Sequence, residues 1–188
     1  MNSYKKSDYL YTALFCEENI WHLAQSLFAA GIKSEDIQIV FITNKNKQIA
    51  IFNQIAVAQN QAVIWDYHVI LLLKTEQSHS IFDFDSRLGF TSDYQNYLKN
   101  SLPDNIITEY SSVFRIIPAQ VYLNYFDSDR SHMQGVIDKQ DFPQYPAIIS
   151  NSEFKLNLRD LFDSQKELKQ TSIVQNTQQL KAWIKNIT

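Results

Sequence analysis

The sequence has a single cysteine, three glycines, four prolines and no long hydrophobic run. One cysteine cannot form an intramolecular disulfide, so we expect a protein of a reducing compartment and assign it to the cytoplasm. So few glycines and prolines exclude collagen-like and flexible-linker architectures. The longest apolar run, Val69 to Leu73, is far shorter than the roughly 20 residues that a membrane span needs, so we expect no membrane association.

Neither sign of charge dominates the chain. The 17 Lys and Arg residues against 20 Asp and Glu residues give a net charge of −3, and no basic stripe occurs. Nucleic-acid binding needs many phosphate-neutralising cations, so we exclude nucleic acid as a partner. A chain of 188 residues that is 45% hydrophobic and 13% aromatic can bury one core. We therefore expect one catalytic-size domain over residues 1–188, acting as a monomer.

Hydrophobic periodicity predicts a helix near the start of the chain. An apolar stripe with helical spacing begins at Ile20 and ends at Phe28. Gly31 is typical of the residue that follows a helix C-terminus. The helix is therefore expected to begin close to Cys16, with Glu17 and Glu18 in its first turn, where the helix dipole favours anions.

Strand patterns dominate the middle of the chain, and helices return towards its end. The predicted strands are 37–43, 48–52, 62–73, 80–85 and 113–117, with the first two expected to pair through a turn at 44–47. The predicted later helices are 92–100, 119–126 and a C-terminal helix from Thr177 with Leu180, Trp183 and Ile184 facing inward. A helix followed by a mostly antiparallel sheet and further helices is an α+β arrangement.

Cys16 is the first residue with evident chemical potential. The thiolate is the reactive form of cysteine, and a helix N-terminus lowers the thiol pKa through its dipole and free N–H groups. The same N–H groups can hold an oxyanion. The alternative is that Cys16 is a small buried hydrophobe.

A histidine and two aspartates supply the other groups of a possible catalytic set. His68 lies in an apolar predicted strand, where a polar ring needs a partner. Asp83 and Asp85 share one face of the next predicted strand. A hairpin turning near Thr75 and Glu76 would place His68 opposite Asp83 and Ile70 opposite Ile81. The alternative is a buried His–Asp pair without a catalytic role. Together with Cys16, the histidine and an aspartate match the catalytic groups of papain-like and transglutaminase-like sites.

Short motifs then indicate a family. They are Y-T-A-L-F-C-E-E-N-I-W from Tyr11, I-W-D-Y-H-V-I-L from Ile64, F-D-F-D from Phe82, F-R-I-I from Phe114 and S-D-R-S-H-M from Ser128. In this order they resemble the protein N-terminal glutamine amidohydrolase family. The resemblance runs from about residue 9 to about residue 162 and leaves 163–188 as a C-terminal helical extension.

The resemblance implies a papain/transglutaminase-like fold and a triad of Cys16, His68 and Asp83, which leaves Asp85 a structural role. It implies deamidation of N-terminal glutamine in proteins and peptides to glutamate, with release of ammonia, through a thioester on the cysteine, without a cofactor, for an N-degron pathway. The alternatives are another papain-like activity, such as a general glutamine deamidase, a transglutaminase or a peptidase, or an inactive module that binds N-termini.

Recognition of the substrate α-ammonium requires an anion or several carbonyl acceptors. Glu17, Glu18 and Asp66 are the candidate anions, and Trp65 is a candidate wall of the pocket. Arg130 is expected to pair with a carboxylate and hold its loop. No metal is expected, because the histidines have no ligand spacing with one another or with the cysteine; they are His22, His68, His79 and His132.

Overall fold

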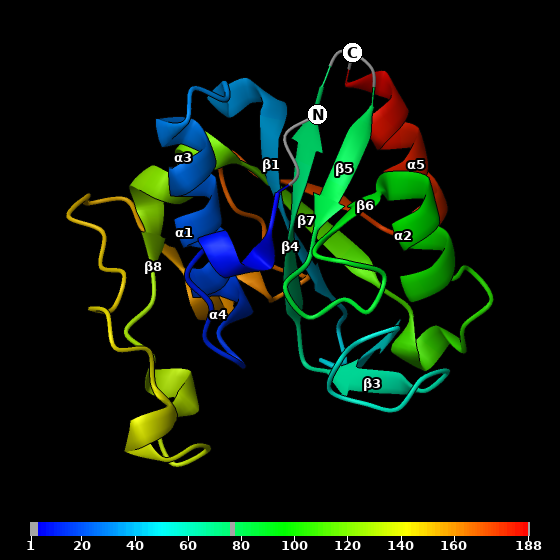
Figure 1. Cartoon of the computed structure of the whole chain (residues 1–188), viewed down its shortest axis with the longest axis horizontal. Helices are drawn as coiled ribbons and strands as arrows, with labels where there is room; N and C mark the ends of the chain where they lie inside the picture. The colour runs from blue at the N-terminus through cyan, green and yellow to red at the C-terminus, as the bar shows by residue number, and fades with distance from the viewer. Residues whose placement is uncertain (1–3, 76–77, 188) are drawn as a thin grey trace.

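The computed structural model describes residues 4–75 and 78–187. Its centre is a six-stranded sheet with the strand order β10-β7-β1-β4-β5-β6 and antiparallel pairing throughout (Figure 1). The strands are β1 (Ile37–Thr43), β4 (His68–Lys74), β5 (His79–Phe82), β6 (Thr91–Asp93), β7 (Val113–Pro118) and β10 (Ser172–Val174). The predicted α+β class with a mostly antiparallel sheet is confirmed.

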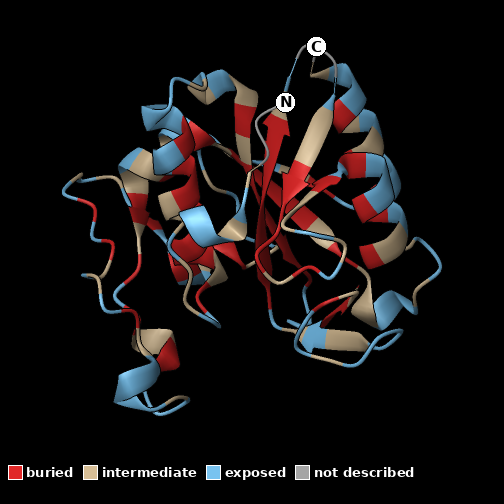
Figure 2. Ribbon diagram, viewed as in Figure 1, coloured by how far each residue is buried: buried red, intermediate tan, exposed pale blue. Residues whose placement is uncertain are grey.

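Helices cover both faces of this sheet. One face carries α1 (Cys16–Ala29), α3 (Ala119–Tyr125) and α4 (Leu158–Leu161); the other carries α2 (Tyr94–Ser101) and α5 (Thr177–Asn186) (Figure 1). Figure 2 shows the sheet and the inner helix faces buried, with the outer helix faces exposed. Single turns of 3₁₀ helix occur at Lys6–Asp8, Ser34–Asp36, Thr108–Tyr110, Ser131–Met133 and Lys139–Asp141. No helix in the described residues has the length and hydrophobicity that crossing a bilayer requires.

Strand alternation in β4 divides the core into two layers. Val69, Leu71 and Leu73 pack with α1, while Ile70 and Leu72 pack with α2 and α5. Successive side chains of a strand point to opposite faces, so a strand buried on both faces reads as one continuous apolar run. This is why Val69 to Leu73 has no polar residue.

The start of α1 is held by side-chain contacts with the chain before it. The Asn19 side chain bonds both the N–H and the carbonyl of Thr12, each at 2.8 Å. Leu14 has a left-handed backbone, with φ of 68°, which turns the chain sharply before the helix. The helix then begins at Cys16 and ends at Ala29, and Gly31 follows with φ of 90°. The predicted helix and its stop are confirmed.

The predicted strand 62–73 is in fact two strands in different sheets. The segment β3 (Ala62–Trp65) pairs with β2 (Ile49–Phe52) in a separate two-stranded sheet, and β4 begins only at His68. The predicted pairing of 48–52 with 37–43 is therefore wrong. The central strand β1 is buried on both faces and takes β4 and β7 as partners instead. A further short parallel pair joins β8 (Phe126–Asp127) to β9 (Leu156–Asn157).

The predicted register between the strands around His68 and Asp83 is wrong by two residues. Leu72, not Ile70, pairs with Ile81, and the ladder ends where Leu71 pairs with Phe82. The turn lies one residue later than predicted, because Thr75 N–H donates to the Ser78 carbonyl at 2.8 Å. Glu76 itself lies outside the described residues. Asp83 and Asp85 follow the end of β5 and so are not part of a strand.

Most of the later helices agree with the predictions. The C-terminal helix begins at Thr177, and both Leu180 and Ile184 are buried. The helix expected over 92–100 begins at Tyr94 instead, because Asp93 caps it by accepting from two backbone N–H groups. The helix expected over 119–126 ends at Tyr125.

Candidate active site

Cys16 is the first residue of α1 and lies against the start of β4. Its thiol donates a hydrogen bond to Glu17, with Sγ 3.7 Å from Oε2. Burial raises the pKa of the Cys16 thiol well above its ordinary value, and the Glu17 carboxylate adds to this. The expectation that the helix start lowers this pKa is therefore wrong, because burial and a neighbouring anion outweigh it. The thiol needs a base to remove its proton.

His68 and Asp83 form a buried pair beside this thiol. The His68 Nε2 atom lies 2.9 Å from Asp83 Oδ1, and the two residues are 2% and 1% exposed. Burial lowers the pKa of His68, but the charge of Asp83 and its hydrogen bond outweigh burial and raise it overall. Burial raises the pKa of Asp83, yet His68 and other donors bring it down to about 2. The carboxylate is therefore ionised at any physiological pH.

The Asp83 carboxylate is held by a full set of donors. Besides His68, its Oδ1 accepts the Asp85 backbone N–H at 2.9 Å. Its Oδ2 accepts from Gln54 Nε2 and from the Tyr97 hydroxyl, each at 2.8 Å. Because an ionised carboxylate only accepts, His68 must carry its proton on Nε2. In the neutral ring the remaining nitrogen, Nδ1, is then unprotonated and can accept a proton from a thiol.

One cavity brings most of the predicted site residues together. It has a volume of about 250 Å³, and its lining includes Cys16, Trp65, Asp66 and His68. The Trp65 ring lies nearly parallel to the His68 ring, with their centres 6.5 Å apart. The Asp66 side chain is exposed at the cavity, and its Oδ1 accepts the Tyr67 backbone N–H at 2.9 Å. Its second carboxylate oxygen is available to a ligand.

The two glutamates after Cys16 have different environments. Arg130 holds Glu18 at two points, with its Nε 2.8 Å from Oε1 and its Nη2 2.6 Å from Oε2. Glu18 is buried and does not line the cavity. Arg130 also donates to the Pro143 and Pro146 carbonyls. This agrees with the loop-holding role expected for Arg130, and it cancels the charge of Glu18.

Glu17 instead keeps an uncompensated carboxyl next to the thiol. Its side chain has no exposed surface, and Tyr67 donates its hydroxyl to Oε2 at 3.0 Å. Its Oε1 has no hydrogen-bond partner and lies 3.6 Å from Nε2 of His132. Burial raises the pKa of the Glu17 carboxyl to about 7.

The sequence interpretation missed His132 and Tyr67, which line the same cavity, and also Gln54 and Tyr97, which hold Asp83. His132 and Tyr67 lie within S-D-R-S-H-M and W-D-Y-H, so those motifs contained a signal. Gln54 and Tyr97 had none, because nothing local in the sequence shows that they reach a carboxylate far along the chain.

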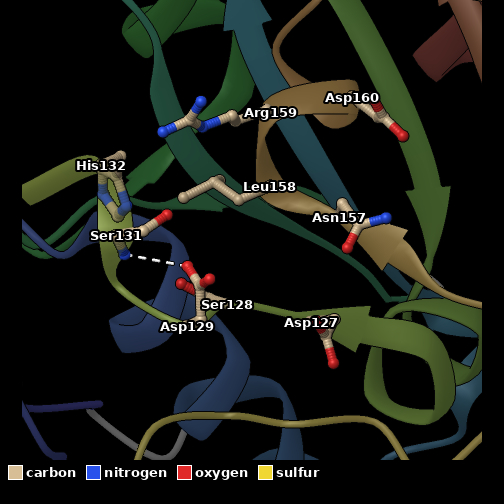
Figure 3. A pocket seen from close by; sticks show the side chains of 9 residues that line it. All are labelled: Asp127, Ser128, Asp129, Ser131, His132, Asn157, Leu158, Arg159 and Asp160. Carbon is tan, nitrogen blue, oxygen red and sulfur yellow. Dashed lines mark hydrogen bonds between the residues drawn. The ribbon is translucent and has the colours of Figure 1, made fainter.

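A second cavity, of about 310 Å³, shares His132 with the first (Figure 3). Its lining is polar and includes Asp127, Asp129, Arg159 and Asp160. In Figure 3 the Asp129 carboxylate accepts the Ser131 backbone N–H, at 2.9 Å. None of the predicted triad residues lies in this cavity, so it is a neighbour of the candidate site and not part of it.

The fold brings together three residues of metal-ligand type that the sequence spacing did not. Ligand atoms of His68, Asp83 and Asp85 lie within 4.8 Å of one another. The oxygens already accept hydrogen bonds, since Tyr11 donates to Asp85 Oδ1 at 2.6 Å and four donors surround Asp83. Such a donor-rich set suits the orientation of an imidazole better than the binding of a cation.

Comparison with known proteins places this arrangement in a family. Residues 11–184 match the sequence model of the N-terminal glutamine amidase family, so the match extends past the recognised motifs into α5. The chain is 34% identical over 165 residues to protein N-terminal glutamine amidohydrolase of Bos taurus, covering 85% of this chain and 79% of that protein. For Homo sapiens the identity is 36% over 157 residues, with coverage of 80% and 76%. For Caenorhabditis briggsae it is 34% over 176 residues, with coverage of 89% and 91%. The chain belongs to the N-terminal glutamine amidase family.

Proposed function

We propose that this protein is an enzyme that hydrolyses the side-chain amide of an N-terminal glutamine in proteins and peptides, releasing ammonia and leaving N-terminal glutamate. Its relatives bear the name of this activity. The observation that carries the proposal is a thiol at a helix start that shares one cavity with an imidazole oriented by a buried carboxylate. We also infer a single papain/transglutaminase-like catalytic domain, monomeric and cytoplasmic, whose product enters an N-degron pathway.

The first half of the reaction forms a thioester. His68 Nδ1 takes the proton of Cys16, and the thiolate attacks the δ-carbonyl carbon of glutamine. Backbone N–H groups at the start of α1 stabilise the oxyanion, and one such donor contributes about 3–4 kcal/mol in comparable sites. The imidazolium then protonates the amide nitrogen, which leaves as ammonia. Asp83 stabilises the positive ring and keeps its proton on Nε2.

The second half returns the enzyme to its starting state. Neutral His68 removes a proton from water, which attacks the thioester carbonyl. The tetrahedral intermediate collapses by breaking the C–S bond, and the proton returns to the sulfur. The products are the free thiol of Cys16 and the γ-carboxyl group of an N-terminal glutamate. No atom other than those of water is added to the substrate.

The anion that binds the substrate α-ammonium is Asp66 in this proposal. Of the candidate anions, Asp66 is exposed at the cavity, Glu18 is neutralised by Arg130, and Glu17 has no exposed surface. A cation that enters the cavity from solvent therefore meets Asp66 first. Trp65 supplies an apolar wall for the methylene groups of the glutamine side chain.

The decisive experiment measures ammonia release from a Gln-initiated peptide, with the product identified by mass. Release from that peptide, but not from its N-acetylated form or from an internal-Gln peptide, supports the proposal. Comparable release from all three would indicate a general glutamine deamidase. Incorporation of an added amine would indicate a transglutaminase, chain cleavage a peptidase, and binding without turnover an inactive recognition module.

A further inference from the structure

Glu17 is an ionisable group next to the nucleophile, and the reaction scheme above gives it no task. Its Oε2 lies 3.7 Å from the Cys16 sulfur, and its Oε1 is a buried acceptor without a hydrogen-bond partner in the described residues. A buried acceptor that lacks a donor destabilises the folded protein. A fold that keeps such a group beside its nucleophile has a reason to do so if the charge of that group acts on the bound substrate.

The surroundings of Glu17 leave its charge uncompensated. Arg130 is engaged at two points by Glu18. In the described residues, the polar contacts of the Glu17 carboxyl are with Cys16, Tyr67 and His132. Burial lowers the pKa of His132, which favours the neutral ring. Ionised Glu17 therefore presents a negative charge behind the reacting atoms.

Substrate and product differ only at the group that meets this charge. A glutamine side chain ends in a carbonyl and an NH2 group, which offers two donors; a glutamate side chain ends in a carboxylate, which only accepts. The NH2 end of the amide dipole would be favoured near a buried negative charge, whereas the product carboxylate would face a like charge in a desolvated site. The two side chains are otherwise alike in length and shape.

We propose that Glu17 distinguishes the substrate amide from the product carboxylate: from behind the Cys16 sulfur, its charge repels the carboxylate that hydrolysis forms. This inference rests on the proposed function. Glu17 has no exposed surface and does not line the cavity, so it acts on the bound side chain through its charge, with Oε2 3.7 Å from the Cys16 sulfur. Glu17 thereby promotes release of the product.

Binding to a catalytically silent protein tests the proposal directly. We would measure by calorimetry at pH 8 the affinity of the Cys16→Ala protein for matched peptides that begin with Gln, Glu or Met. The Gln peptide should bind at least about 10-fold more tightly than the Glu peptide, because like charges facing each other cost several kcal/mol. The Met peptide, neutral and without side-chain donors, should bind with intermediate affinity.

The neutral isostere then assigns the effect to one residue. Adding Glu17→Gln to Cys16→Ala should bring the Gln and Glu affinities to within about 2-fold, since the repelling charge is gone. The matched control is Asp66→Asn in the same background. It should weaken both peptides equally and leave their ratio unchanged, because both carry the α-ammonium that Asp66 binds.

The outcomes separate this inference from the proposed function. If the wild-type protein releases no ammonia from the Gln peptide, the proposed function fails. If it does release ammonia but Cys16→Ala binds Gln and Glu peptides equally, the discrimination by Glu17 is refuted. It is also refuted if the Gln and Glu peptides still bind with very different affinities after Glu17→Gln is added to Cys16→Ala. Should the double variant fail to fold, the three-peptide comparison on Cys16→Ala still decides whether a carboxylate is rejected.

Discussion

The Nε2 atom of His68 lies 2.9 Å from Oδ1 of Asp83, although the two residues are not paired in the sheet. The ladder between β4 and β5 ends at the pair Leu71–Phe82, three residues from His68, and Asp83 reaches the ring from the segment after β5. Gln54 and Tyr97 hold its other oxygen. The imidazole is thus oriented by a carboxylate that three separate parts of the chain fix in place.

Replacing Cys16 by Ala should abolish turnover while leaving the melting temperature within a few degrees of wild type. The substitution removes the only thiol, and the residue is a small side chain at a helix start, where alanine fits without strain. Ammonia release and thermal unfolding are the two measurements. Iodoacetamide should inactivate the native enzyme with a single alkylation, checked by mass. Turnover by Cys16→Ala would refute the thioester mechanism.

Replacing Asp83 by Asn should lower kcat by about 10⁴-fold, as loss of the orienting carboxylate does in other triads. The amide can donate to the ring and so favours a proton on Nδ1, where the thiol needs an acceptor. Asp85→Asn is the matched control. Asp85 accepts from Tyr11 and makes no hydrogen bond to the ring within the described residues, so this variant should mainly lower stability. The opposite pair of phenotypes would show that Asp85 is the supporting carboxylate.

Replacing Asp66 by Asn should raise KM for a Gln-initiated peptide far more than it lowers kcat. The ammonium loses its anion, while Cys16 and His68 stay in place. With the wild-type enzyme, an Asn-initiated peptide should react at least about 100-fold more slowly than the Gln-initiated peptide. The shorter Asn side chain misplaces the carbonyl by about 1.5 Å. Steady-state kinetics on both peptides is the measurement. An unchanged KM in Asp66→Asn would remove this residue from the ammonium site.

Glu17→Gln should stabilise the protein at pH 8 more than at pH 5. Burial raises the folded-state pKa of Glu17 from 4.5 to about 7, so the folded state binds this proton more tightly than the unfolded chain. Binding of that proton stabilises the folded state fully below pH 4.5, and this stabilisation is lost as the pH rises through 7. The loss lowers the free energy of unfolding by at most about 3 kcal/mol. Urea unfolding of both proteins across this range measures it.

Exhaustive chelation should leave the rate unchanged. The oxygens of Asp83 and Asp85 that face His68 already accept hydrogen bonds, and the thiol and imidazole need no cation to react. Activity on a Gln-initiated peptide is measured before and after treatment, with metal content determined in parallel. Activity that disappears on chelation and returns with zinc would assign the cluster of His68, Asp83 and Asp85 to a metal.

Local signals in the sequence were sufficient for some of the site and insufficient for the rest. The register predicted between β4 and β5 was wrong, yet Asp83 was selected correctly as the partner of His68, because the family motif and the apolar setting of His68 both required a carboxylate nearby. The expectation for the thiol pKa failed for a different reason. A helix start was visible in the sequence, but the burial of Cys16 and the contact with Glu17 were not.

The sequence by itself determined the helix that begins at Cys16, its stop before Gly31, the C-terminal helix and the α+β class. These depend on periodicity and end signals within a few neighbouring residues, so they can be read locally. Only the tertiary structure decided that 62–73 divides between two sheets, that Arg130 neutralises Glu18, and that His132 and uncompensated Glu17 lie beside the thiol. Those features arise from contacts between segments far apart in the chain. The free energy gained by burial determines which segments pack together, and no local sequence pattern indicates which they are.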